Sequence, residues 1–99
     1  MRRAARIDDN QREIAEALKR CGCSVEYLSA VGKGVPDLLV GFRGKNYLLE
    51  VKDGSKAPSK RRLTNPQKYW HSMWRGFVVI VESVDDALAA VGMGVINAK

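Results

Sequence analysis

The chain has 99 residues, of which 45% are hydrophobic and 28% are charged, and its net charge is +6. We expect residues 1–99 to form a single domain, because this length supports one modest core without disulfides or a structural metal. The apolar runs are short, so neither a membrane helix nor a secretory signal peptide is predicted, and we expect a cytoplasmic protein.

The cysteines and the histidine do not predict a zinc site. Cys21 and Cys23 are separated by one residue, which is too close for a disulfide in a helix or strand. With a single histidine elsewhere, they cannot supply the usual four zinc ligands. We therefore expect reduced thiols and no organic cofactor. The positive net charge favours a polyanionic partner, of which nucleic acid is the common one.

The first half of the chain predicts one helix followed by three strands. Apolar residues recur at helical spacing over residues 8–21, and Gly22 supplies the stop. Residues 25–28 favour a strand that ends in the flexible Gly32-Lys33-Gly34. Residues 37–42 and 46–52 are the clearest strands, and the short connection between them predicts a hairpin.

The second half predicts a loop, a helix, a strand and a last helix. After a polar loop at 54–62, Thr64 and Gln67 form a capping box that opens a helix running to about Trp74. The β-branched run 77–81 is typical of a strand buried on both faces. Ser83 and Asp86 cap a final helix that Gly92 ends. The order predicts an α/β fold, α-β-β-β-α-β-α, around one mixed sheet.

The hairpin brings charged residues together at its open end. If Gly44 and Lys45 are the two central turn residues, Asp37 lies opposite Lys52, and Leu39 lies opposite Glu50. Residues opposite each other share a face, and so do residues two apart, so Asp37, Glu50 and Lys52 converge. An odd-length loop or a bulge would reverse this, because a slip of one residue changes the face.

Two carboxylates beside an ammonium group are typical of a magnesium site. Magnesium prefers hard oxygen ligands and typically takes one or two carboxylates, which Asp37 and Glu50 can supply, with the backbone carbonyl of Val51 as a third oxygen. Lys52 would then orient or deprotonate the attacking water, or stabilise charge on a phosphate. The alternative is a cross-strand ion pair of Asp37 and Lys52 with a solvated Glu50.

These residues resemble a known nuclease family. Pro36-Asp37 followed by Glu50-Val51-Lys52 resembles the PD-(D/E)XK nuclease superfamily. Gly32-x-Gly34-x-Pro36-Asp37 and the later Gln67 make the chain similar, over nearly its whole length, to the stand-alone VRR-NUC (virus-type replication-repair nuclease) domains of phages and bacteria. The resemblance implies a restriction-endonuclease-like core and a bacterial or phage-infected host cell.

The resemblance also implies roles for individual residues. It makes Asp37 and Glu50 the metal-binding carboxylates, Lys52 the catalytic lysine, and Gln67 the helix residue that reaches back to the site. The family adds an acidic residue from the first helix. The candidates are Asp8, Asp9, Glu13 and Glu16, of which we prefer Asp8, with Gln11 supporting it. Asp8 serves equally well as the N-cap of that helix.

The implied function is magnesium-dependent hydrolysis of DNA phosphodiester bonds, with manganese as a substitute, in DNA repair. Stand-alone members of the family resemble Holliday-junction resolvases, so we expect a homodimer that acts on branched DNA. One alternative is a non-catalytic basic module of the same fold that binds nucleic acid. Another is a small interaction protein whose tryptophan-bearing helix forms the contact surface.

For other basic and aromatic residues, the sequence favours a role less strongly. Five basic residues, which are Lys33, Lys56, Lys60, Arg61 and Arg62, would contact DNA phosphates or belong to solvated loops. Trp70 and Trp74 lie four residues apart on one helix, which favours a place in the core or in a subunit interface over base stacking. We expect His71 to be structural, because a metal–lysine site needs no histidine.

Overall fold

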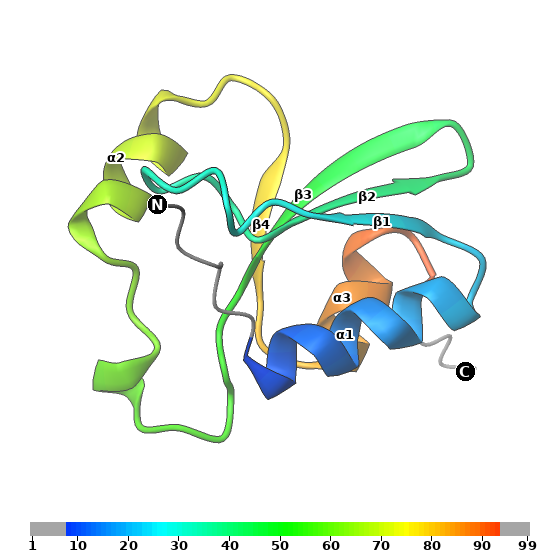
Figure 1. Ribbon diagram of the computed structural model, residues 1–99, viewed down its shortest axis with the longest axis horizontal. Coiled ribbons are helices and arrows are strands. Elements are labelled where there is room, and N and C mark those ends of the chain that lie inside the picture. The colour runs from blue at the N-terminus through cyan, green and yellow to red at the C-terminus, as the bar shows by residue number, and fades with distance from the viewer. Residues whose placement is uncertain (1–7, 94–99) are drawn as a thin grey trace, which may run out of the picture.

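The computed structural model describes residues 8–93, which form three α-helices, a short 3-10 helix and four strands (Figure 1). In chain order these are α1 (Asp9–Arg20), β1 (Ser24–Tyr27), β2 (Leu38–Phe42), β3 (Lys45–Val51), η1 (Pro58–Lys60), α2 (Asn65–Met73), β4 (Val78–Val81) and α3 (Val84–Ala90). The element order agrees with the sequence prediction, and η1 is a single turn within the predicted polar loop. Within residues 8–93, no helix is long and apolar enough to cross a membrane.

The four strands form one mixed sheet in the order β1-β2-β3-β4. The β1–β2 and β2–β3 pairs are antiparallel, whereas β4 runs parallel to β3. This confirms an α/β fold with a single mixed sheet. The long connection that the parallel β3–β4 pair requires contains α2.

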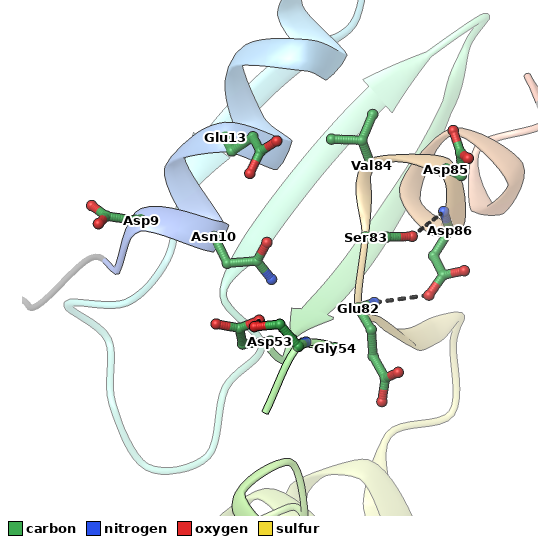
Figure 2. A pocket seen from close by; sticks show the side chains of 11 residues that line it. Asp9, Asn10, Glu13, Asp53, Gly54, Glu82, Ser83, Val84, Asp85 and Asp86 are labelled. Carbon is green, nitrogen blue, oxygen red and sulfur yellow. Dashed lines mark hydrogen bonds between the residues drawn. The ribbon is translucent and has the colours of Figure 1, made fainter. Parts of the chain in front are cut away.

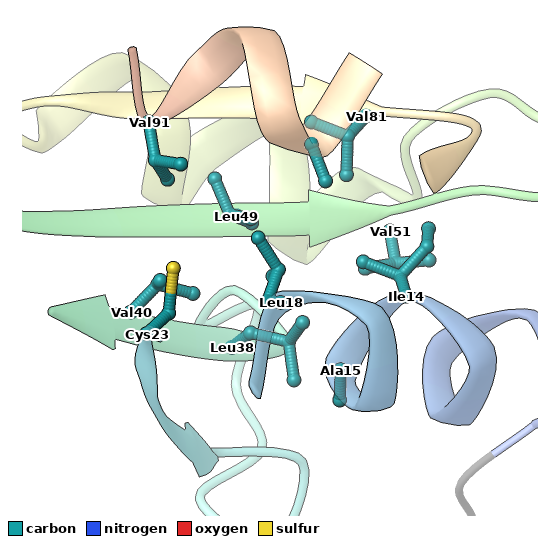
Figure 3. Close-up of a cluster of buried hydrophobic side chains, with 11 residues drawn as sticks. Ile14, Ala15, Leu18, Cys23, Leu38, Val40, Leu49, Val51, Val81 and Val91 are labelled. Atoms are coloured by element: carbon teal, nitrogen blue, oxygen red, sulfur yellow. The ribbon is translucent and has the colours of Figure 1, made fainter. Parts of the chain in front are cut away.

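Two helices cover one face of the sheet and enclose the core. In Figure 1, α1 and α3 lie together on one side of the sheet, while α2 stands apart from them. Aliphatic side chains of the two helices meet those of the central strands, as Figure 3 shows. The fully buried members include Ile14, Leu18, Leu38, Val40 and Leu49. Cys23 is buried at the edge of this core and Cys21 is exposed, and both are free thiols as predicted.

The structure shows the predicted caps of α2 and α3, and for Asp8 it shows the capping role that was the alternative to metal binding. Asp8 is the N-cap of α1, where its Oδ1 accepts a hydrogen bond from the backbone N–H of Gln11 at 2.8 Å. Thr64 and Gln67 form both bonds of the capping box that opens α2. The Oγ of Ser83 accepts from the backbone N–H of Asp86 at the start of α3. These bonds satisfy amide groups that have no partner inside the helix.

The predicted register of the hairpin was wrong, because the turn lies one residue earlier in the chain than expected. The structure pairs Leu39 with Leu48 and Phe42 with Lys45, so Arg43 and Gly44 are the central turn residues. Both have positive φ, 52° and 80°, which is typical of a type I′ turn. The turn moves by one residue, which shifts each cross-strand partner by two positions. A shift of two keeps every side chain on its predicted face, so the expected convergence survives the correction.

The last strand is less buried than its sequence suggested. The run at 77–81 was predicted to be buried on both faces, but β4 is an edge strand in which only Val81 is buried. Phe77 precedes the strand and is exposed, and Ile80 is 42% exposed. Ile80 pairs with Glu50 and points to the face opposite α1 and α3, where it remains in contact with solvent.

Candidate active site

The alternation of side chains along β3 separates the core from the candidate site. Leu49 and Val51 point into the helix-covered core, so Glu50 and Lys52 point to the opposite face. The observed pairing of Leu38 with Leu49 brings Asp37, one residue earlier, beside Glu50. The Oδ2 of Asp37 accepts a hydrogen bond of 2.8 Å from the backbone N–H of Val51. Asp37 is therefore fixed against the end of β3.

Glu50 is a buried acid in contact with a second acid. Its relative exposure is 0%. Burial, hydrogen bonding to Asp37 and the charge of Asp37 raise the pKa of Glu50 to about 9, although the charge of Lys52 opposes this rise. The alternative of a solvated Glu50 is therefore wrong, and no ion pair joins Asp37 to Lys52 within residues 8–93. In the absence of a cation, this raised pKa favours the protonated form of Glu50 at neutral pH.

Gln67 links three parts of the site. Its Oε1 accepts hydrogen bonds of 2.8 Å from the Nζ of Lys52 and from the backbone N–H of Thr64. Its Nε2 donates a hydrogen bond of 3.1 Å to the Oε2 of Glu50. The sequence left open whether Gln67 caps α2 or reaches the site, and the structure shows both contacts at once.

His71 also contacts Glu50, although its sequence position alone did not predict this contact. Its Nε2 lies 3.2 Å from the Oε1 of Glu50, and its side chain is 15% exposed. Burial, followed by the charge of Lys52, lowers the pKa of His71 below its usual value, which favours the neutral ring. The available signal was the four-residue spacing from Gln67, which places both side chains on one face of α2.

The first helix approaches the site through Asn10 rather than through an acid. The Nδ2 of Asn10 donates a hydrogen bond of 2.8 Å to the backbone carbonyl of Lys52. Asp8 is exposed and caps α1, while the side chain of the buried Gln11 donates to the Oγ of Ser29 at 2.9 Å. In the described part of the chain, no hydrogen bond or ion pair joins an acidic candidate of α1 to Asp37 or Glu50. Those candidates are Asp8, Asp9, Glu13 and Glu16.

A pocket of about 420 Å³ gives access to Asp37 and Gln67 from solvent. Its walls are the loop Gly32-Lys33-Gly34 and the first turn of α2. Gly34 has a φ of +83°, and a Cβ there would overlap the backbone carbonyl of Pro66. Only glycine allows this loop to approach α2 so closely, so the loop and the helix together form the entrance to the site.

The five basic residues expected to contact DNA have different surroundings. Four are exposed, namely Lys33, Lys56, Lys60 and Arg62. Arg61 is only partly exposed, and its Nε donates to the backbone carbonyl of Lys56 at 2.7 Å. Its Nη1 lies 3.4 Å from the Oε1 of Glu82. Arg61 therefore connects the loop between β3 and α2 to Glu82, which follows β4. The other four basic residues are more available to contact a phosphate.

A second, larger pocket of about 790 Å³ is acidic (Figure 2). It lies where the start of α1 meets the segment after β3 and the start of α3. Six carboxylates line it, which are Asp9, Glu13, Asp53, Glu82, Asp85 and Asp86. No lysine or arginine belongs to its lining, so this side of the molecule repels a phosphate backbone.

Large apolar side chains are exposed along one stretch of the chain. They include Tyr69 at 68%, Met73 at 59% and Trp74 at 46%, followed by Phe77 and Ile80. The rings of Trp70 and Trp74 stack at 4.6 Å, and Trp74 and Phe77 border a pocket of about 380 Å³ on the open face of the sheet. The core was one place expected for these tryptophans, and the exposure of Trp74 excludes it for that residue.

The donor set suits a hard divalent cation better than zinc. Within residues 8–93, no three His, Cys, Asp or Glu side chains gather in a way that could hold a metal. Asp37 and Glu50 instead supply two carboxylates, one of them wholly buried and therefore in need of a positive charge when ionised. Two carboxylates and several waters are the ligands that Mg²⁺ typically takes in proteins.

A solved structure described as a VRR_NUC domain is similar to this chain. The two superpose with a TM-score of 0.63 at 29% sequence identity, and the match covers 89% of this chain and 96% of that one. No family model matches the sequence, and no curated protein matches it either. The similarity thus extends over nearly the whole of both chains.

Proposed function

We propose that the chain is a VRR-NUC domain and a metal-dependent nuclease that hydrolyses DNA phosphodiester bonds, and its similarity to a solved VRR_NUC domain over 89% of the chain supports this. A nuclease of the PD-(D/E)XK type has a restriction-endonuclease-like core, which residues 1–99 would form as one domain. The observation that carries the proposal is the wholly buried Glu50 held against Asp37, with Lys52 and Gln67 beside them.

Asp37 and Glu50 would hold the cation, with the backbone carbonyl of Val51 as a further oxygen ligand. Mg²⁺, or Mn²⁺ in its place, supplies positive charge for the phosphate and acidity for the attacking water. Binding requires Glu50 to release its proton, and the positive charge of the cation would favour that release.

Lys52 would act on the reacting phosphate or on the water. Its Nζ is held at 2.8 Å by the Oε1 of Gln67, so the ammonium group is oriented before substrate arrives. From this position it stabilises charge that develops on the phosphate oxygens or orients the water for in-line attack. No covalent enzyme intermediate is required.

Charge supports one direction of approach for the DNA. The exposed Lys33 stands at the entrance of the 420 Å³ pocket, and Lys56, Lys60 and Arg62 follow β3 in the next loop. The acidic pocket repels phosphate on the other side of the strand end. The sugar-phosphate backbone of the DNA would therefore pass over the loop Gly32-Lys33-Gly34 toward Asp37.

We further propose a homodimer that cuts branched DNA such as a Holliday junction. The likeness to stand-alone VRR-NUC domains suggests the substrate, since two symmetry-related sites suit a four-way junction. The exposed side chains from Tyr69 to Ile80 offer an apolar surface for the second copy. The small size of the chain favours recognition of DNA shape over DNA sequence.

The direct test compares labelled four-way junction, flap and linear DNA, each with Mg²⁺, with Mn²⁺ or with chelator. We expect cleavage of the junction that depends on the cation and is lost in Asp37→Asn and in Lys52→Ala. Thermal melts of both variants should show a folded protein. Cleavage that survives in either variant would refute the site.

Two other outcomes would favour the rival functions. Salt-dependent DNA binding without cleavage under any metal would favour a non-catalytic nucleic-acid-binding module. Absence of both binding and cleavage would favour an interaction protein that uses the exposed apolar stretch. Light scattering with and without a four-way junction tests the dimer separately.

A further inference from the structure

Two side chains of α2 hold the two oxygens of one buried carboxyl group. The Nε2 of Gln67 lies 3.1 Å from the Oε2 of Glu50, and the Nε2 of His71 lies 3.2 Å from its Oε1. Gln67 and His71 are four residues apart, so they come from successive turns of the same helix. Each oxygen of Glu50 thus has its own partner.

This arrangement restricts how the carboxyl group can turn. The terminal torsion of a glutamate is broad and close to two-fold, so little within the side chain itself fixes the plane of its oxygens. Two contacts from a rigid helix, one to each oxygen, fix that plane. Each oxygen also has a second lone pair, which leaves Glu50 able to bind a cation while both contacts persist.

Burial makes the contact with His71 hard to replace. Glu50 has no exposed surface, so in the metal-free protein its oxygens depend on protein groups for their hydrogen bonds. The side chain of His71 is itself only 15% exposed, which holds the ring in place. Removing the ring nitrogen would leave Oε1 without this partner and free the carboxyl group to rotate about Gln67.

We propose that His71 is a positioning residue that, together with Gln67, orients Glu50 for a divalent cation. This inference rests on the proposed function, because it gives His71 a task at the same metal site. His71 touches neither substrate nor the reacting atoms in this role. Partners of metal-ligating groups typically contribute about 10–100-fold in metal affinity or activity.

The test uses a pair of amide variants that differ in reach. His71→Gln places an N–H donor at nearly the distance of the imidazole Nε2, whereas His71→Asn is one methylene shorter and cannot reach Glu50. His71→Leu removes the ring nitrogen but keeps apolar bulk, and Ser72→Ala controls for a substitution at the next, exposed position of α2. Mg²⁺ and Mn²⁺ binding are measured by calorimetry without DNA, and thermal melts are recorded with and without each metal.

We expect His71→Asn and His71→Leu to weaken metal binding by about 10–100-fold and to reduce the metal-induced rise in Tm. His71→Gln should recover most of the affinity, and Ser72→Ala should match the wild type. In cleavage assays, the Asn variant should need more metal for half-maximal rate, while its KM for DNA stays unchanged. Because the Gln and Asn variants are both polar, a loss of fold in His71→Leu alone leaves the comparison intact.

The outcomes separate this inference from the proposed function. If the wild type binds metal and cleaves DNA, and His71→Asn binds metal equally well, the positioning role is overturned and the nuclease stands. A lower Tm in His71→Asn with unchanged metal affinity also overturns that role, because it makes His71 a packing residue only. If the wild type neither binds metal nor cleaves, the proposed function fails first.

Discussion

The two faces of the sheet use the same strand for opposite purposes. On the face covered by α1 and α3, β3 contributes Leu49 and Val51 to a dry aliphatic core. On the other face, the alternate residues Glu50 and Lys52 contact polar side chains of α2. The core face gains stability from burial, whereas the site face contains an acid whose burial is unfavourable when it is ionised.

This contrast shows how a small domain supports a charged site. The core lies directly beneath the charged residues, so the strand that carries them is held by packing on its other side. Glu50 therefore remains buried next to Asp37 even though the pair disfavours two negative charges. Burial and the nearby Asp37 disfavour the ionised form of Glu50 in the metal-free protein, and a bound cation would compensate its negative charge.

Substitutions at two neighbouring residues of β3 should have different effects on activity and stability. Glu50→Gln should lower DNA cleavage by at least about 100-fold, since an amide cannot supply the negative charge the cation requires. Leu49→Ala should lower the free energy of unfolding by about 2–5 kcal/mol, because it leaves a cavity in the core. Urea denaturation and cleavage assays on both variants measure the two effects. Substantial cleavage by folded Glu50→Gln would contradict the assignment of the catalytic role to the face of β3 that carries Glu50.

The pH dependence of stability should come from the site face. Unfolded Glu50 titrates near 4.5 and folded Glu50 has a pKa of about 9, so between these values the folded protein holds a proton that the unfolded chain releases. The contribution of Glu50 to the stability of the metal-free protein should therefore be greatest below the lower value and fall as pH rises toward the upper one. The slope should be at most about 1.4 kcal/mol per pH unit.

Denaturation of the metal-free protein at several pH values checks this slope. Glu50→Gln should remove it. Because the cation must displace the proton, Mg²⁺ should stabilise the wild type more at about pH 8.5 than at about pH 5.5. A wild-type curve as flat as that of Glu50→Gln would show that Glu50 is ionised in the metal-free protein.

A smaller effect should follow from substitutions in the glycine loop that borders the site. Gly34→Ala places a methyl group against the carbonyl of Pro66, while Gly32→Ala meets nothing within 4 Å. Both glycines have positive φ, so each alanine costs about 1–2 kcal/mol of unfolding free energy. Gly34→Ala should cost more and also lower cleavage, because it displaces the first turn of α2 that carries Gln67. Equal stability and equal cleavage in the two variants would show that the close approach is unimportant.

The smallest effect should come from Asp8 at the start of α1. Asp8→Ala should lower the free energy of unfolding by about 1 kcal/mol, since it removes the N-cap, whereas Asp8→Asn keeps a capping side chain. Thermal melts measure this difference, and we expect both variants to cleave DNA. A folded Asp8→Asn protein that has lost cleavage would make Asp8 the metal ligand from the first helix.

Much of the site could be predicted from the sequence because its geometry depends on local periodicity. Glu50 and Lys52 are two apart on one strand and share a face in any register. The hairpin brings Asp37 to the same face for every even-length turn, so the error at Gly44-Lys45 changed partners without changing faces. The functional roles of these residues stay predictions until cleavage is measured.

The contacts of α2 could not be predicted in the same way. His71 is 21 positions from Glu50 in the sequence, and the contact depends on how the helix packs across the sheet. Arg61 illustrates the same difficulty, since its pairing with Glu82 distinguishes it from basic neighbours of identical sequence character. Spacing within a helix shows which residues share a face, but not which strand that face meets.

Local sequence patterns were enough to predict the order of helices and strands, the caps of α2 and α3, and the face of the hairpin that carries Asp37, Glu50 and Lys52. Each of these depends on residues close together in the chain, where backbone geometry and hydrogen bonding act locally. Tertiary structure alone decided the turn at Arg43-Gly44, the complete burial of Glu50 and the exposure of β4. These depend on which elements cover which face, and that is settled only when distant segments pack together.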